Sequence, residues 1–256
     1  MSDVYNDLMK RYVDLLALSL TGALYEDPPL IACGTDVYDE NLRLYGADWP
    51  STALTMIGQK RLDNVVQLIR SVIGNKVPGD FVETGVWRGG ACIMACGVLK
   101  AHGVTDRRVI ACDSFAGLPT GNGEKYPHDA DSGFHSYSDL AVSLDEVKAN
   151  FARYGLLDDM VVFVEGWFNE SMSRVPSKQI AVLRLDGDMY ESTICPLEHL
   201  YDRVPEGGWI IVDDYHVVPA CKAAVHDFFS GRSLKPVLHE IDGTGVCLQK
   251  NTTGMV

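Results

Sequence analysis

Four aspartates in two short segments have the clearest capacity for chemistry. The segment LRLDGDMYEST (183–193) contains Asp186 and Asp188, and IIVDDYH (210–216) contains Asp213 and Asp214. Carboxylates that converge without a lysine or arginine among them repel one another, and hard divalent cations with oxygen ligands relieve that repulsion. We expect no such basic residue here, so the segments predict a Mg²⁺ site. The alternative is that each aspartate caps a following helix or turn.

A glycine-rich segment, FVETGVWRGGA (81–91), forms a second candidate site. Glu83, Gly85 and Gly89 have the spacing E-x-G-x-x-x-G, ahead of a helix expected to begin near Gly90. The G-x-G-x-x-G of dinucleotide binders, which receives a pyrophosphate, is absent, so a ligand without phosphate is favoured. S-adenosylmethionine is such a ligand: Glu83 would bind its ammonium group and loop amides its carboxylate. A turn that needs glycine for steric reasons alone is the alternative.

Two further apolar runs end in residues suited to a nucleoside. Asp113, followed by Ser114, stands where an acidic residue in mononucleotide-binding units accepts hydrogen bonds from ribose hydroxyls. Gly166 and Trp167, with Phe168 after them, would form a wall for the adenine. The alternatives are a helix cap for Asp113 and core packing for the aromatic side chains.

A metal beside a sulfonium methyl donor suggests a mechanism. A neutral alcohol is a poor nucleophile, and coordination to a metal lowers the pKa of its hydroxyl and orients its oxygen. One aspartate would then accept the proton as general base. His135 and His216 are rival candidates for this base, although a single histidine is more often structural or exposed.

The elements that position these residues alternate between strand and helix patterns. Apolar runs typical of strands occupy residues 80–84, 109–113, 161–165, 180–186 and 209–213, with helical patterns between them. Residues 61–73 have helical apolar spacing and are followed by Gly74. Such alternation predicts a doubly wound α/β fold with a mostly parallel sheet, in which ligands bind at the carboxyl ends of the strands.

Composition excludes several classes of protein. The chain has 256 residues and a net charge of -13, which disfavours binding to nucleic acid. Acidic residues stand within residues 1–10, where a signal peptide would be positively charged, and no apolar stretch reaches the roughly 18 residues of a membrane span. We therefore expect a cytoplasmic protein. Its seven cysteines are expected to be buried reduced thiols: Cys33, Cys92, Cys96, Cys112, Cys195, Cys221 and Cys247.

The chain resembles the macrocin O-methyltransferase family, the metal-dependent enzymes that methylate deoxysugars on glycosylated antibiotics. Five segments carry the resemblance: TMIGQKRLDN (55–64), FVETGVWRGGA (81–91), DSFAGLP (113–119), RLDGDMYEST (184–193) and VDDYH (212–216). The resemblance implies a Rossmann-like, seven-stranded class I methyltransferase fold. It also implies an N-terminal helical extension and cofactor lid at residues 1–76, followed by a catalytic domain at residues 77–256.

The resemblance also assigns roles to residues. Asp186, Asp213 and Asp214 would hold the metal, with Asp186 also the general base. The residues expected to bind S-adenosylmethionine are Thr55, Met56, Ile57, Glu83, Thr84, Gly85, Gly89, Asp113, Ser114, Ser143, Gly166, Trp167 and Asp186. A homo-oligomer, dimer or tetramer, is implied as well, with N-terminal elements reaching a neighbouring subunit.

The acceptor is the least determined part of this prediction. Residues 120–139 form a long Gly-, Asp-, Ser- and Pro-rich connection, typical of a mobile lid, which would order over a bound sugar. A phenol or catechol acceptor is the main alternative to a deoxysugar. A non-catalytic nucleotide-binding protein is disfavoured by the intact acids, and an NAD-dependent epimerase by the missing glycine and the absence of a Tyr-x-x-x-Lys pair.

Overall fold

One seven-stranded sheet organises the chain. The structure, a computed structural model, describes residues 3–30 and 34–251, so Cys33 lies outside the described residues. The strand order is β3-β2-β1-β4-β5-β7-β6, in which β1 to β5 pair in parallel and β7 is antiparallel to both β5 and β6. The strands are β1 (Asp80–Thr84), β2 (Val109–Asp113), β3 (Val161–Glu165), β4 (Ile180–Leu185), β5 (Trp209–Val212), β6 (His239–Glu240) and β7 (Val246–Gln249).

The central strands are continuous apolar runs because helices cover both of their faces. Every residue of β1 and of β4 is buried, which is typical of parallel strands inside a doubly wound sheet. The predicted bounds of β1, β2 and β3 are confirmed, whereas β4 and β5 end one residue before the predicted Asp186 and Asp213. Both aspartates therefore begin the loops at the carboxyl edge of the sheet.

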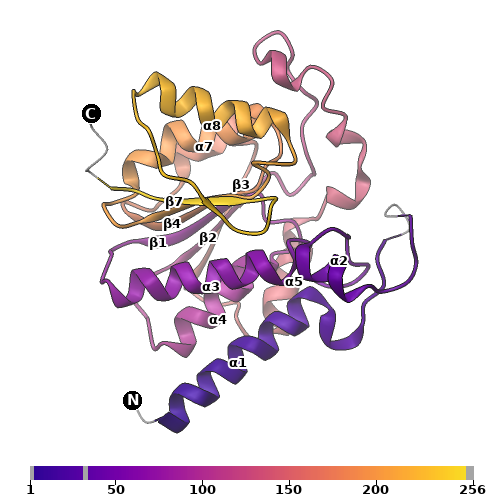
Figure 1. The fold of residues 1–256 in the computed structure, drawn as a ribbon, viewed down its shortest axis with the longest axis vertical. Coiled ribbons are helices and arrows are strands. Elements are labelled where there is room, and N and C mark those ends of the chain that lie inside the picture. The colour runs from indigo at the N-terminus through magenta and orange to yellow at the C-terminus, as the bar shows by residue number, and fades with distance from the viewer. Residues whose placement is uncertain (1–2, 31–33, 252–256) are drawn as a thin grey trace.

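Helices form a layer on each face of the sheet (Figure 1). One layer contains α3 (Gly58–Gly74), α4 (Gly90–Ala101) and α5 (Leu144–Arg153), with α1 (Asp3–Thr21) outside it and α2 (Glu40–Tyr45) beside α3. The other contains α6 (Phe168–Ser171), α7 (Tyr190–Leu200) and α8 (Pro219–Gly231). Short 3-10 turns complete the chain: Ala23–Tyr25, Pro127–Asp129, Phe134–Ser136, Ser138–Leu140, Met172–Arg174 and Tyr201–Arg203.

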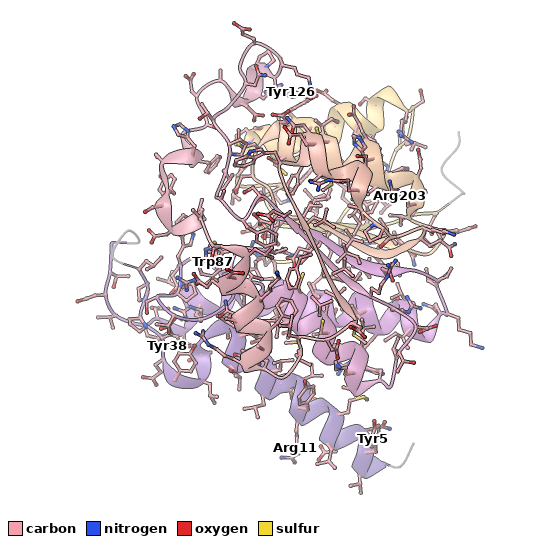
Figure 2. All side chains as sticks on the ribbon, turned by 180° about the vertical axis from the view of Figure 1, so that it is seen from behind. Tyr5, Arg11, Tyr38, Trp87, Tyr126 and Arg203 are labelled. Atoms are coloured by element: carbon pink, nitrogen blue, oxygen red, sulfur yellow. The ribbon has the colours of Figure 1, made fainter. Side chains whose placement is uncertain are left out.

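The N-terminal helices share a core with the sheet. Leu16 and Leu20 of α1 belong to the same buried apolar cluster as Leu62 of α3 and Ile93 of α4. The N-terminal half of α1, which contains Tyr5 and Arg11, extends away from the sheet (Figure 2). The boundary at residue 76 stays a prediction.

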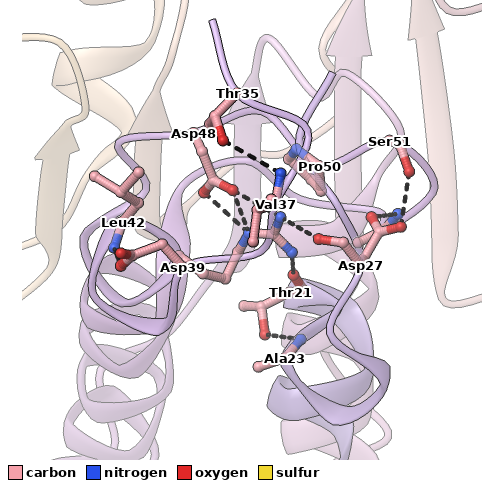
Figure 3. Close-up of polar contacts among 12 residues, drawn as sticks. Thr21, Ala23, Asp27, Thr35, Val37, Asp39, Leu42, Asp48, Pro50 and Ser51 are labelled. Atoms are coloured by element: carbon pink, nitrogen blue, oxygen red, sulfur yellow. Dashed lines mark hydrogen bonds and ion pairs between the residues drawn. The ribbon is translucent and has the colours of Figure 1, made fainter. Parts of the chain in front are cut away.

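A buried ion pair ties the N-terminal segments together (Figure 3). The Arg43 guanidinium is 1 % exposed; it pairs with Asp48 at 2.7 Å and donates to the carbonyl oxygens of Thr21 and Asp27 at 2.6 and 2.7 Å. The Asp27 carboxylate accepts the Ala53 N–H at 2.9 Å, along with three donors from residues 51 and 52. The segment around residue 53 is thereby held against the end of α1.

Among residues 3–30 and 34–251, no helix has both the length and the apolar character that crossing a bilayer requires.

Six cysteines are buried free thiols, as predicted: Cys92, Cys96, Cys112, Cys195, Cys221 and Cys247.

Candidate active site

A cavity of about 310 Å³ opens at the carboxyl edge of the sheet, between the loops that follow β1, β2, β3 and β4. Of the residues predicted to bind S-adenosylmethionine, those that line it are Thr55, Met56, Ile57, Glu83, Gly85, Asp113, Ser114, Trp167 and Asp186. Those that do not line it are Thr84, Gly89, Ser143 and Gly166. The structure thus brings most of the predicted set to one place.

Glycine is required in the loop after β1 because the backbone there passes close to the loop after β4. Gly85 has φ +87°, and a Cβ on it would lie 1.6 Å from the carbonyl oxygen of Asp186. Gly89 has φ +89° at the N-terminus of α4. Gly85 leaves no room for a side chain, and a side chain at Gly89 would be strained by the positive φ, so the loop presents its backbone to the cavity.

The Asp113 carboxylate holds this loop in place. Its Oδ2 accepts the Val86 N–H at 2.7 Å, and its Oδ1 accepts the Phe115 N–H at 2.8 Å. Burial raises the pKa of Asp113 against these hydrogen bonds, which favour the charged form. A carboxylate fixed in this way at the cavity wall can accept hydrogen bonds from ribose hydroxyls.

Residues 54–57 also line the cavity, and hydrogen bonds fix this segment from two sides. The N–H groups of Leu54 and Thr55 both donate to the Leu20 carbonyl at the end of α1, at 3.0 and 3.1 Å. The Leu54 carbonyl accepts the Gly90 N–H at 3.0 Å, at the start of α4. The segment therefore joins the N-terminal helix to the glycine loop.

Glu83 at the end of β1 is a buried carboxyl with two partners. It pairs with Arg184 of β4 and accepts the Cys92 thiol at 2.8 Å. Burial raises the pKa of Glu83 to about 7, and the positive charge of Arg184 opposes this rise.

The three predicted metal ligands converge. Asp186, Asp213 and Asp214 each offer an oxygen, and these oxygens all lie within 4.8 Å of one another. Asp188 lines the neighbouring part of the cavity. The convergence of the loops after β4 and β5 is what adjacent parallel strands require.

The expectation that no basic residue lies among these acids is wrong. Arg184 pairs with Asp186 at 2.7 Å, with Asp213 and with Glu83, and Arg61 of α3 pairs with Asp213 and, at 3.0 Å, with Asp242. Arg184 had a signal in the sequence, because residues two apart on a strand point to the same face. Arg61 had none, since its position depends on how α3 packs.

Among the three converging acids, Asp214 is the one without a positively charged partner in the described residues. It accepts the Asp188 N–H at 3.1 Å, and no ion pair reaches it from any residue that the structure describes. Burial and the neighbouring acids raise the pKa of Asp214 well above its ordinary value. An oxygen donor set with one uncompensated buried carboxyl fits a hard divalent cation.

The rival bases and Ser143 lie elsewhere. His216 is next to Glu240, with its Nε2 2.9 Å from the carboxylate, and His135 is exposed in the 3-10 turn Phe134–Ser136; neither lines the cavity. Ser143 caps α5, where its hydroxyl accepts the Glu146 N–H at 3.2 Å. Asn169 and Glu191 also line the cavity, and no sequence pattern pointed to them, whereas Thr120 and Asn122 line it from the connection that was predicted to be a lid.

Comparisons with known proteins decide the family. Residues 9–250 match the family described as Macrocin-O-methyltransferase (TylF). The chain belongs to this macrocin O-methyltransferase family. It is 47 % identical over 245 residues, 94 % of this chain and 92 % of the relative, to the 8-demethyl-8-(2,3-dimethoxy-alpha-L-rhamnosyl)-tetracenomycin-C 4'-O-methyltransferase of Streptomyces olivaceus.

Two further matches agree. Mycinamicin III 3''-O-methyltransferase of Micromonospora griseorubida is 45 % identical over 243 residues, covering 93 % of this chain and 95 % of the relative. The solved structure of the O-methyltransferase NovP superposes with a TM-score of 0.91 at 46 % identity, covering 95 % of this chain and 99 % of that one. These matches confirm the predicted fold and the prediction that the chain is an O-methyltransferase. Membership of a methyltransferase family implies S-adenosylmethionine as the methyl donor.

Proposed function

We propose that this macrocin O-methyltransferase family member transfers the methyl group of S-adenosylmethionine to a hydroxyl of a deoxysugar on a glycosylated natural product. One relative is named for a rhamnosyl-tetracenomycin and another for mycinamicin III, which supports a glycosylated acceptor. The observation that carries the proposal is one cavity that is lined by the glycine loop, by Asp113 and by Asp186.

The cofactor is proposed to lie along the glycine loop. Glu83 would accept hydrogen bonds from the ammonium group of the cofactor, and Asp113 would accept them from its ribose hydroxyls. Residues 55–57 would close over the methionine end, and Trp167 would lie beside the adenine. The positions that complete the proposed set are Thr84, Gly85, Gly89, Ser114, Ser143, Gly166 and Asp186. Those outside the cavity lining would act through the backbone or after closure of a loop.

Asp186, Asp213 and Asp214 would hold a divalent cation, with Mg²⁺ the natural candidate. When bound, the cation lowers the pKa of the acceptor hydroxyl. Asp186 would then accept the proton. Arg184 holds its Oδ2 at 2.7 Å, and no donor among the described residues bonds its Oδ1. Arg184 also balances the charge of Glu83 and Asp213, which limits repulsion within the site.

A homo-oligomer and a cytoplasmic location are proposed as well. Four side chains on the outer face of α1 are apolar and exposed: Val4, Leu8, Leu15 and Leu18. Successive members of this group lie four, seven and three residues apart, so they share one side of the helix. An apolar helix face open to solvent is a candidate contact between subunits, with the oligomeric state measurable by light scattering.

The first test is binding followed by turnover. Calorimetric titration with S-adenosylhomocysteine, with and without Mg²⁺, is expected to give saturable binding. Turnover is then measured with mycinamicin III, the rhamnosyl-tetracenomycin glycoside and a panel of catechols. Methylation of a glycoside supports the proposal, whereas methylation of catechols alone would establish the phenolic alternative. Absence of binding by folded, ligand-free protein would refute the cofactor assignment.

Cofactor affinity is expected to depend on pH through Glu83. Because the pKa of Glu83 is raised to about 7, the carboxylate that binds the ammonium group forms as pH rises through 7. The Kd for S-adenosylhomocysteine should therefore rise as pH falls from 8 to 6, approaching a roughly tenfold change per pH unit below 7. In Glu83→Gln the Kd should be higher than in wild type and nearly independent of pH. If the Kd of the variant changes with pH as it does in wild type, another group titrates.

A further inference from the structure

The N-terminus of α7 is capped by an aspartate from a distant loop. Asp129 lies in the connection 120–139, and its side chain is fully buried. Its Oδ1 accepts the Tyr190 N–H at 2.7 Å and its Oδ2 accepts the Glu191 N–H at 2.9 Å. The local N-cap position, Met189, has no side-chain oxygen to serve these donors. Asp129 therefore performs the capping that the helix sequence itself lacks.

Ring packing and a tight chain crossing reinforce this attachment. The rings of Tyr126 and His128 lie 5.5 and 5.4 Å from the ring of Tyr190. A Cβ on Gly121 would lie 1.8 Å from the Asp129 carbonyl oxygen, so the start and the middle of the loop touch. Figure 2 shows Tyr126 on this loop, beside the helical layer that contains α7 and α8. The part of the loop from residue 121 to 129 is thus one compact unit fixed to α7.

The attachment brings two groups of polar side chains to the same cavity. Thr120 and Asn122 line it from the loop, and Asn169 and Glu191 line it from α6 and α7. The Asn169 amide donates to the Glu191 carboxylate at 3.2 Å. Hydroxyl, amide and carboxylate groups are the partners that sugar hydroxyls require, and none of these four residues is used by the cofactor or the cation in the proposed site.

We propose that Asp129 is a positioning residue for the acceptor: by fixing the loop to α7, it holds Thr120 and Asn122 opposite Asn169 and Glu191 as a rim that binds neighbouring hydroxyls of a pyranose ring. This inference rests on the proposed function. It differs from a mobile lid, because hydrogen bonds and ring contacts attach residues 126–129 to the start of α7.

The test compares Asp129→Asn with Asp131→Asn, an exposed aspartate of the same loop. Asparagine keeps one acceptor oxygen, but its NH₂ group faces the second helix N–H, so half of the cap is lost. We expect the KM for the glycoside acceptor to rise about tenfold in Asp129→Asn, the order of a lost cap. The kcat and the Kd for S-adenosylhomocysteine should stay within about twofold, and Asp131→Asn should match wild type throughout.

Hydrogen exchange separates a positioning role from a general loss of stability. The backbone amides of residues 190 and 191 should exchange faster in Asp129→Asn than in wild type. In Glu191→Gln these amides should exchange at the wild-type rate, but the KM for the acceptor should rise because a carboxylate of the rim is removed. If Asp129→Asn shows faster exchange but an unchanged KM, the positioning role of Asp129 is overturned, while the proposed function is not affected. Wild-type protein that binds S-adenosylhomocysteine but methylates no glycoside would overturn the proposed function, and the sugar rim with it.

Discussion

Asp186→Asn is expected to lower kcat/KM for the acceptor by about 10³-fold or more. The substitution removes the proposed proton acceptor and one of three cation ligands in a single step, and positioned general bases alone contribute roughly 10² to 10⁴-fold. Asparagine preserves the shape of the side chain and can still accept the hydrogen bond that Arg184 donates to Asp186. The melting temperature should therefore change little.

Asp188→Asn is the matched control for this substitution. Asp188 lines the same cavity two residues further on but lies outside the group of three converging oxygens. We expect its kcat/KM to fall much less than that of Asp186→Asn. Near-normal turnover in a folded Asp186→Asn protein would remove Asp186 from the mechanism, and equal losses in both variants would assign the effect to the charge of the cluster as a whole.

Removal of divalent cations is expected to have the second large effect. After treatment with EDTA and dialysis, turnover should fall by at least about 100-fold and return on addition of Mg²⁺, since polarisation of the acceptor oxygen by a cation amounts to several kcal/mol. Binding of S-adenosylhomocysteine should persist, because the glycine loop and Asp113 do not depend on the metal. The metal content of the dialysed protein is measured by mass spectrometry.

Asp214→Asn gives the matched variant for the metal. Asp214 has no ion pair with the described residues and is not in the cavity lining, so its substitution should weaken cation binding without removing a group that touches the acceptor. We expect a higher Mg²⁺ concentration for half-maximal activity and a kcat partly restored at saturating Mg²⁺. Full activity in metal-free wild-type protein would contradict the proposed cation site.

The sequence by itself determined the five parallel strands and most of the candidate site, whereas β6 and β7 had no pattern of their own in the prediction. Uninterrupted apolar runs mark strands that are buried on both faces, and the carboxyl ends of parallel strands must share one edge. Glu83, Asp113 and Asp186 could therefore be placed together without coordinates. Residues 55–57 came only from the family resemblance, because nothing in their spacing connects them to the glycine loop.

Only the tertiary structure decided which side chains surround these acids. Arg61 reaches Asp213 across 152 positions, and Asp129 reaches the start of α7 across 61. Such contacts depend on how a helix or a loop packs onto the sheet. A local sequence pattern records the period of one element, and it contains no information about the partner that a polar side chain meets after two elements come together.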